Sequence, residues 1–94
     1  MTYEEFERSL AAPKPPKSLS ALARALWLVK KGDWDGAHEI VSDDGSAMAA
    51  RIHAHLHRVE GDLGNARYWY GNAGVPPETG TIESEWEKLA RDVT

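Results

Sequence analysis

The sequence predicts an all-helical domain, and three observations lead to that prediction. Apolar residues recur at helical spacing along most of the chain. Serine, threonine or aspartate precedes each such stretch, and these residues cap helix N-termini. No stretch alternates between apolar and polar residues as a half-buried strand would. With 94 residues, 41% of them hydrophobic and 28% charged, the chain has the composition of one globular domain spanning residues 1–94.

The N-terminal third predicts two helices separated by a proline-rich linker. Thr2 and Glu5 form a capping box, which predicts a short helix from Tyr3 to about Ala11, within a terminal segment 1–12. Three prolines between residues 13 and 16 then impose an extended linker. We expect Ser18 to cap a helix over residues 19–31. That helix is apolar on nearly every side, so the rest of the chain or a second copy in a homodimer must cover it.

Four more helices are expected downstream. Asp33 is suited to cap one over residues 34–41, and the polar run 42–46 forms a turn and caps the next, over 47–60. Asp62 caps a helix over 63–73 that Gly74 ends, and Pro76 and Pro77 break the chain after it. The last helix, over 81–92, belongs to a C-terminal segment 78–94. We expect Phe6 and Trp86 to plug the two ends of the core.

Two segments of the chain resemble each other. Residues 32–41 align without gaps on residues 61–70, and each segment follows a helix and begins with Gly-Asp. Gly61, Ala66, Tyr70 and Ala73 have the spacing of the glycine, small and aromatic positions of the tetratricopeptide repeat, which the segment resembles. The resemblance implies two antiparallel helical hairpins over residues 18–74, flanked by capping helices, and a role in binding a protein or peptide. The spacing of the two glycines, 61 − 32 = 29 residues, is shorter than the family's usual length of about 34.

A second resemblance covers part of the same region. The stretch from His55 to Gly74 reads HLHRVEGDLGNARYWYGNAG. It is similar to a small family of uncharacterised bacterial and fungal proteins. This similarity implies no activity.

A group of histidines suggests a metal site. His53 and His57 are four residues apart on one predicted helix, so their rings project from the same side, and Glu60 follows one turn later. His38 on the preceding helix can complete a set of nitrogen and oxygen ligands for Zn²⁺ or a similar ion. The alternative is that these histidines fill packing positions and bond to the backbone or to Tyr70.

Another side of the same helix suggests a binding groove. Arg51, His55 and Arg58 occupy positions that, in the repeat family, face the concave surface. Two arginines and a histidine suit a carboxylate or phosphate group on a partner. The alternative is a solvated edge on which the arginines pair with nearby carboxylates.

Aromatic residues are dense in the second repeat. Tyr68, Trp69 and Tyr70 are consecutive, and successive helical residues diverge by about 100°, so they cannot all face the core. We expect Tyr68 or Trp69 to be exposed as an interface anchor or to pack under residues 75–77.

Composition and motifs exclude several classes of function. The net charge of −4 argues against a nucleic-acid partner, and the absence of cysteine excludes disulfides and thiolate chemistry. There is no signal peptide and no membrane-spanning run, so we expect a cytoplasmic protein with no membrane partner. No nucleophile elbow or phosphate-binding loop is present. The sequence therefore favours a non-catalytic interaction module without a cofactor. The alternative is a small metal- or ligand-binding protein, which could also be an enzyme.

Overall fold

Six helices and no strand make up the structure, a computed structural model that describes all of residues 1–94. The fold class predicted from the sequence is therefore confirmed. None of the helices has the length and apolar character needed to cross a bilayer. The helices are α1 (Tyr3–Ser9), α2 (Ala21–Lys30), α3 (Trp34–Ser42), α4 (Ala47–Val59), α5 (Leu63–Ala73) and α6 (Ile82–Val93).

Side-chain caps set the starts of these helices. The side chain of the residue before each helix accepts a hydrogen bond from a backbone N–H of the first turn. The capping box of Thr2 and Glu5 is present, but α2 is capped by Ser20 and not by Ser18. The prediction of Ser18 was wrong because residues 16–19 form a turn, in which Leu19 N–H donates to Pro16 O at 3.3 Å, before the helix begins.

The two segments of the sequence repeat adopt the same turn. Gly32 and Gly61 have φ values of +85° and +84°, which favour glycine, and an aspartate follows each. Asp33 N–H donates to Leu28 O at 2.9 Å, and Asp62 N–H donates to His57 O at 2.8 Å. Each aspartate then caps the following helix. The internal repeat is thus a repeat of helix–turn–helix geometry.

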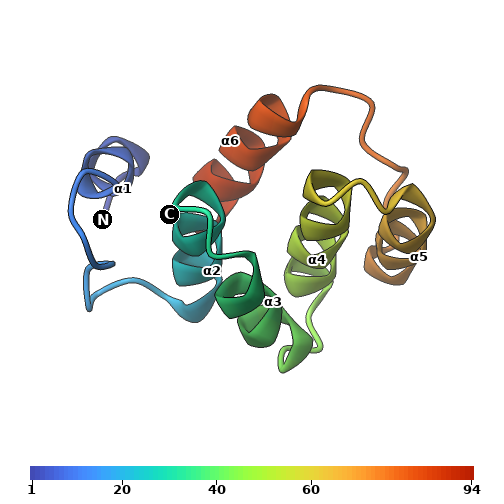
Figure 1. Ribbon diagram of the computed structural model, residues 1–94, viewed down its shortest axis with the longest axis horizontal. Helices are drawn as coiled ribbons and strands as arrows, with labels where there is room; N and C mark the ends of the chain where they lie inside the picture. Colours follow the sequence, from blue (N-terminus) through green and yellow to red (C-terminus); the bar gives the residue numbers. More distant parts are fainter.

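Neighbouring helices in the sequence pack side by side from α2 to α5, and α6 runs back across α2 and α4 (Figure 1). The short helix α1 and the helix α5 lie at opposite ends of the molecule. The main core is formed by buried side chains of α1, α2, α3, α4 and α6, among them Phe6, Leu26, Trp27, Ile52 and Leu89.

The apolar helix α2 is covered within the single chain. Trp27 is buried, and its Nε1–H donates to Ser9 Oγ, at the end of α1, at 3.2 Å. On the α6 side, Trp86 Nε1–H donates to Leu26 O at 2.8 Å, and the Trp86 ring stacks on Phe6 with ring centroids 5.9 Å apart. Phe6 and Trp86 are both buried, so the terminal helices contribute to the core, but the two rings stack on each other and do not plug two separate ends as we expected.

The α4–α5 pair is held by small residues and one aromatic. Ala54 of α4 forms a buried cluster with Ala66 and Tyr70 of α5. Trp69 and Val75 are partly buried and pack on this cluster. Two alanines at a helix contact allow close approach of the backbones. The likeness of this arrangement to the tetratricopeptide repeat stays a prediction.

Candidate metal centre

Three histidines from two helices meet at the contact between α3 and α4. The Nε2 atoms of His38 and His53 lie 3.0 Å apart. The ring of His57 lies one helical turn along α4, its centroid 5.0 Å from that of His53 and 5.7 Å from that of His38. One nitrogen of each ring lies within 4.8 Å of the other two. The structure therefore brings together the three histidines that the sequence singled out; we call them the histidine cluster.

Two tryptophans hold the rings of this cluster. The indole of Trp34 stacks on His38, with centroids 4.7 Å apart and planes inclined by 12°. Trp34 is itself fixed because its Nε1–H donates to Leu56 O at 2.7 Å. On the other side, Trp69 of α5 stacks on His53 with centroids 3.8 Å apart. The cluster thus joins α3, α4 and α5, and its rings are oriented before any ligand arrives.

Burial keeps His53 uncharged. His53 and His57 are almost fully buried, and His38 is half-buried. The pKa of His53 is lowered from 6.5 to about 4, mainly by burial and to a smaller extent by electrostatic repulsion from His38 and His57. His53 is therefore neutral at pH 7, and a neutral imidazole is the form that binds a metal. Its Nδ1 is buried without a hydrogen-bond partner.

Glu60 lies beside the cluster and contacts only His57 within it. Its Oε1 accepts a hydrogen bond from Nδ1 of His57 at 2.7 Å. We expected Glu60 as a ligand, but in this structure its carboxylate fixes the ring of His57 from the side away from Nε2. A carboxylate in that position sets the tautomer and leaves the Nε2 lone pair for a metal.

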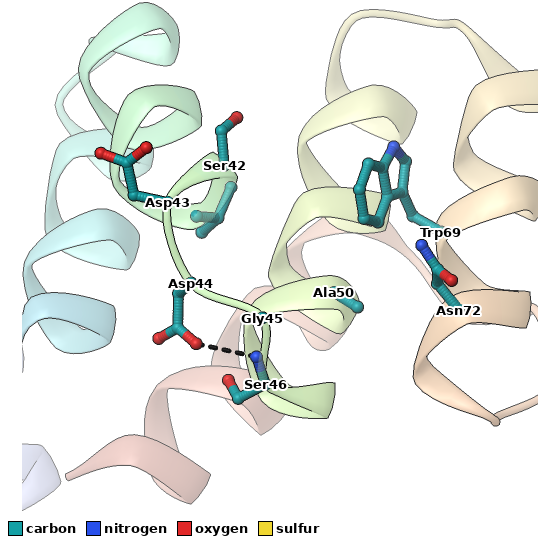
Figure 2. Close-up of a pocket in the computed structure, with 9 residues that line it drawn as sticks. Ser42, Asp43, Asp44, Gly45, Ser46, Ala50, Trp69 and Asn72 are labelled. Atoms are coloured by element: carbon teal, nitrogen blue, oxygen red, sulfur yellow. Dashed lines mark hydrogen bonds between the residues drawn. The ribbon is translucent and has the colours of Figure 1, made fainter.

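An open hollow of about 270 Å³ adjoins the cluster between the α3–α4 loop and α5 (Figure 2). Trp69, which stacks on His53, forms one wall, and Ser42, whose Oγ lies 3.4 Å from Nδ1 of His38, forms another. The carboxylates of Asp43 and Asp44 turn away from the indole, and that of Asp44 accepts from Ser46 N–H. The hollow therefore has an aromatic wall and hydroxyl groups, but none of the three histidines lines it.

The side chains expected along one groove, Arg51, His55 and Arg58, do not line a common hollow, because α6 packs on that face of α4. Arg51 pairs with Asp92 of α6 at 3.2 Å, and His55 is fully buried. The amphipathic helix α6 must bury Trp86 and Leu89, and the face of α4 next to α2 provides the surface for it. The expectation that these three side chains meet a partner in a concave groove is thus corrected by the position of α6.

His55 and Arg58 instead belong to a buried group centred on Glu85, which we call the Glu85 cluster. Oε1 of Glu85 accepts hydrogen bonds from His55 Nδ1 at 2.7 Å and from Arg58 Nη1 at 2.9 Å. The hydroxyl of Tyr70 donates to Oε2, and Arg58 Nη2 also donates to Gly80 O at 2.6 Å. Burial alone would raise the pKa of Glu85, but the hydrogen bonds from His55, Tyr70 and Arg58 prevail and lower it.

Sequence reasoning missed Glu85 and the role of Tyr70, although a signal for Glu85 was present. Ile82, Glu85, Trp86 and Leu89 follow the spacing of one helix face, so Glu85 lies within the apolar stripe of α6. A carboxylate in such a stripe needs a buried cation or donor. Tyr70 donates to this carboxylate and makes no bond to the histidine cluster, contrary to the alternative considered for the histidines.

The three consecutive aromatics of α5 point in different directions, as helical geometry requires. Tyr70 is buried, Trp69 is half-buried on His53, and Tyr68 is 62% exposed. Tyr68 is therefore the exposed aromatic residue of this group.

Comparison with protein families, with curated proteins and with solved structures finds no match to this chain. The candidate function consequently depends on the geometry of the histidine cluster.

Proposed function

We propose that this protein binds a divalent transition-metal ion, with Zn²⁺ as the expected occupant, through His38, His53 and His57. The observation that carries the proposal is the convergence of one nitrogen from each ring within 4.8 Å. Zn–N bonds of about 2.05 Å place two nitrogens on a tetrahedral ion about 3.3 Å apart. The 3.0 Å between His38 and His53 is close to that value, and the third nitrogen, on His57, lies within 4.8 Å of both.

The chemistry of the donor set supports zinc over a hard cation. Three imidazole nitrogens suit Zn²⁺, Cu²⁺ or Ni²⁺, whereas Mg²⁺ and Ca²⁺ prefer oxygen ligands. The depressed pKa of His53 means that no proton has to be displaced from an imidazolium at neutral pH. Glu60 supplies the carboxylate that commonly orients a zinc-bound histidine.

Three protein ligands leave one position of a tetrahedral ion for water or another small ligand. A bound ion with an open position activates water, so the proposed site is compatible with either a metal-binding or a hydrolytic role.

The test is a titration of the chelator-treated chain with Zn²⁺. We expect one equivalent to bind, and an excess at about 100 times Kd to stabilise the folded state by about 2.7 kcal/mol. In a domain of this size, that is a rise in Tm of roughly 10–20 °C. The variant His38→Ala should lose this rise, whereas Ser42→Ala, which removes a hydroxyl contacting the same ring, should keep it. A folded wild-type chain that binds no Zn²⁺, Cu²⁺ or Ni²⁺ would leave the histidines with a structural role only.

A second candidate function, an interaction module that binds a protein or peptide or forms a homodimer, has the exposure of Tyr68 in its favour. Light scattering over a range of concentrations tests the homodimer, and Tyr68→Ala should weaken it. A strict monomer at millimolar concentration would refute the homodimer.

A further inference from the structure

A second group of metal-ligating side chains lies where α4 ends and the turn to α5 begins. His57, Glu60 and Asp62 each offer one ligand atom, and these three atoms all lie within 4.8 Å of one another. We call these residues the outer group. His57 is buried, with its ring against that of Trp34, whereas Glu60 and Asp62 are exposed. The outer group thus joins a fixed imidazole to two carboxylates at the surface.

The nitrogen of His57 that belongs to the outer group faces a surface side chain. Its Nδ1 donates to Oε1 of Glu60 at 2.7 Å, and the Glu60 side chain is 40% exposed. Two ligand atoms on one ion lie about 3 Å apart when each metal–ligand bond is about 2.1 Å long. An ion between Nδ1 and Oε1 therefore requires only a small retraction of a side chain that already extends into solvent.

Both carboxylates have an oxygen to spare and no positively charged partner. Asp62 uses Oδ1 to cap α5, where it accepts from Asn65 N–H at 3.2 Å, and its Oδ2 accepts no hydrogen bond. Glu60 uses only Oε1, for His57. The lysine and arginine side chains that form ion pairs do so with other carboxylates. Two like charges so close together disfavour each other, and a shared cation removes that cost.

The equivalent turn of the first repeat shows which of these side chains the fold requires. The residues at the same three positions there are Leu28, Lys31 and Asp33. The backbone bond from the aspartate N–H is the same in both turns, at 2.9 Å in the first and 2.8 Å in the second, and each aspartate caps the next helix. The turn therefore accounts for the aspartate but not for His57 or Glu60.

We propose that His57, Glu60 and Asp62 bind a divalent cation of the Mn²⁺ or Zn²⁺ class at the surface, with water completing its coordination. One imidazole and two carboxylates suit ions that accept both nitrogen and oxygen, whereas Mg²⁺ and Ca²⁺ prefer oxygen alone. The outer group does not need the histidine cluster to hold a metal. Where that cluster holds zinc as proposed, the two ions compete for His57, because a neutral imidazole keeps one hydrogen and leaves only one nitrogen free to bind a metal.

The test is a titration of the chelator-treated full-length chain with Mn²⁺, which broadens the amide NMR signals of nearby residues. Mn²⁺ is the probe because the histidine cluster offers it no carboxylate, the type of ligand that suits this ion. We expect one saturable site, with the broadening centred on residues 57–65. His38→Ala, which removes a ligand from the histidine cluster alone, should give the same result. Loss of Mn²⁺ binding in His38→Ala would place the ion at the histidine cluster and refute the outer site.

A matched pair of variants in the two turns locates the ion. Asp62→Asn removes the charge but keeps the cap of α5, because asparagine caps a helix as well as aspartate does, and Asp33→Asn makes the same change before α3. We expect Asp62→Asn to raise the Kd for Mn²⁺ by at least about 10-fold, since losing a direct ligand costs no less than losing a ligand's hydrogen-bond partner. Asp33→Asn should leave the Kd unchanged.

His57→Leu, which copies Leu28 of the first repeat, should abolish saturable Mn²⁺ binding. Retention by this variant would show that the carboxylates bind the ion without the imidazole. Equal Kd values for the two asparagine variants, or no saturable site in the wild type, would mean adventitious binding to acidic surface groups only. Each of these three results would overturn the proposal.

Discussion

The Nε2 atoms of His38 and His53 face each other at 3.0 Å between α3 and α4, and two tryptophans hold the rings from outside. At this distance two neutral imidazoles share one hydrogen, with one ring as donor and the other as acceptor. An ion bound to both nitrogens would lie off the line that joins them, because half of 3.0 Å is shorter than a Zn–N bond of about 2.05 Å. The predictions for the histidine cluster follow from this relationship.

Replacing His53 by phenylalanine should separate metal binding from packing. His53→Phe retains a flat ring against Trp69 and removes both the facing Nε2 and the unpartnered Nδ1. We expect Zn²⁺ affinity to fall by more than about 100-fold, since losing a direct ligand exceeds the 10- to 100-fold typical of losing a ligand's hydrogen-bond partner. The Tm without metal should change little, because the substitution removes the unpartnered Nδ1 of His53 while Nε2 of the half-buried His38 loses its partner. Calorimetric titration and thermal melts with chelator measure the two effects, and Tyr68→Phe is the control.

Removing the carboxylate behind His57 should weaken the metal centre without abolishing it. Glu60→Ala takes away the acceptor of the 2.7 Å bond from Nδ1, so the ring of His57 is no longer held. We expect Zn²⁺ to bind about 10- to 100-fold more weakly. The control is Glu39→Ala, which removes an exposed carboxylate on α3; this variant should bind Zn²⁺ like the wild type. Equal affinity in the two variants would show that Glu60 has no part in the site.

The stability of the metal-free chain should decrease as the pH falls from about 6.5 towards 4. The pKa of His53 is about 4 in the folded chain and 6.5 in the unfolded one. Between these values the unfolded chain binds a proton that the folded chain excludes, so acid favours unfolding, and above pH 6.5 the effect is absent. Urea denaturation at several pH values in chelator measures it. His53→Phe should flatten the dependence above pH 5; a slope unchanged by that substitution would assign it to other groups.

The Glu85 cluster should stabilise the fold through Tyr70. Tyr70→Phe removes one donor to the buried carboxylate and leaves the ring in place. A hydrogen bond to a charged group contributes about 1.5–3 kcal/mol, and we expect the free energy of unfolding to fall by that amount. Tyr68→Phe, at an exposed position of the same helix, should change it by less than about 0.5 kcal/mol. Urea denaturation compares the two, and equal stability would exclude a contribution from this bond.

The alanines at the α4–α5 contact should not tolerate enlargement. Ala66 is 2% exposed and packs beside Ala54 and Tyr70, so Ala66→Leu forces the helices apart. We expect a loss of about 1–3 kcal/mol. Arg67→Leu adds an apolar side chain at the next, exposed position and should be close to neutral. If thermal melts show Ala66→Leu to be as stable as Arg67→Leu, the small residues are not needed at this contact.

Much of the candidate site could be predicted from the sequence because its residues follow helical spacing. His53 and His57 share a face through their separation of four, and the short turn over residues 43–46 returns the chain so that the preceding helix lies against them. The role of Glu60 could not be predicted, because whether its carboxylate reaches the shared centre or the far side of His57 depends on the rotamers of both side chains. The burial of His55 and Arg58 depended on α6, whose position no local pattern specified.

By itself, the sequence determined the six helices, their caps apart from that of α2, and the turn that both repeats adopt, because these depend on residues within a few positions of one another. Only the tertiary structure decided that α6 returns across α4, that Glu85 meets His55 at 2.7 Å, and that His38 meets His53. The physical reason is that the side of one helix that meets another depends on how all the apolar faces are buried together. That competition involves residues such as Trp86 and Leu26, which lie far apart in the sequence.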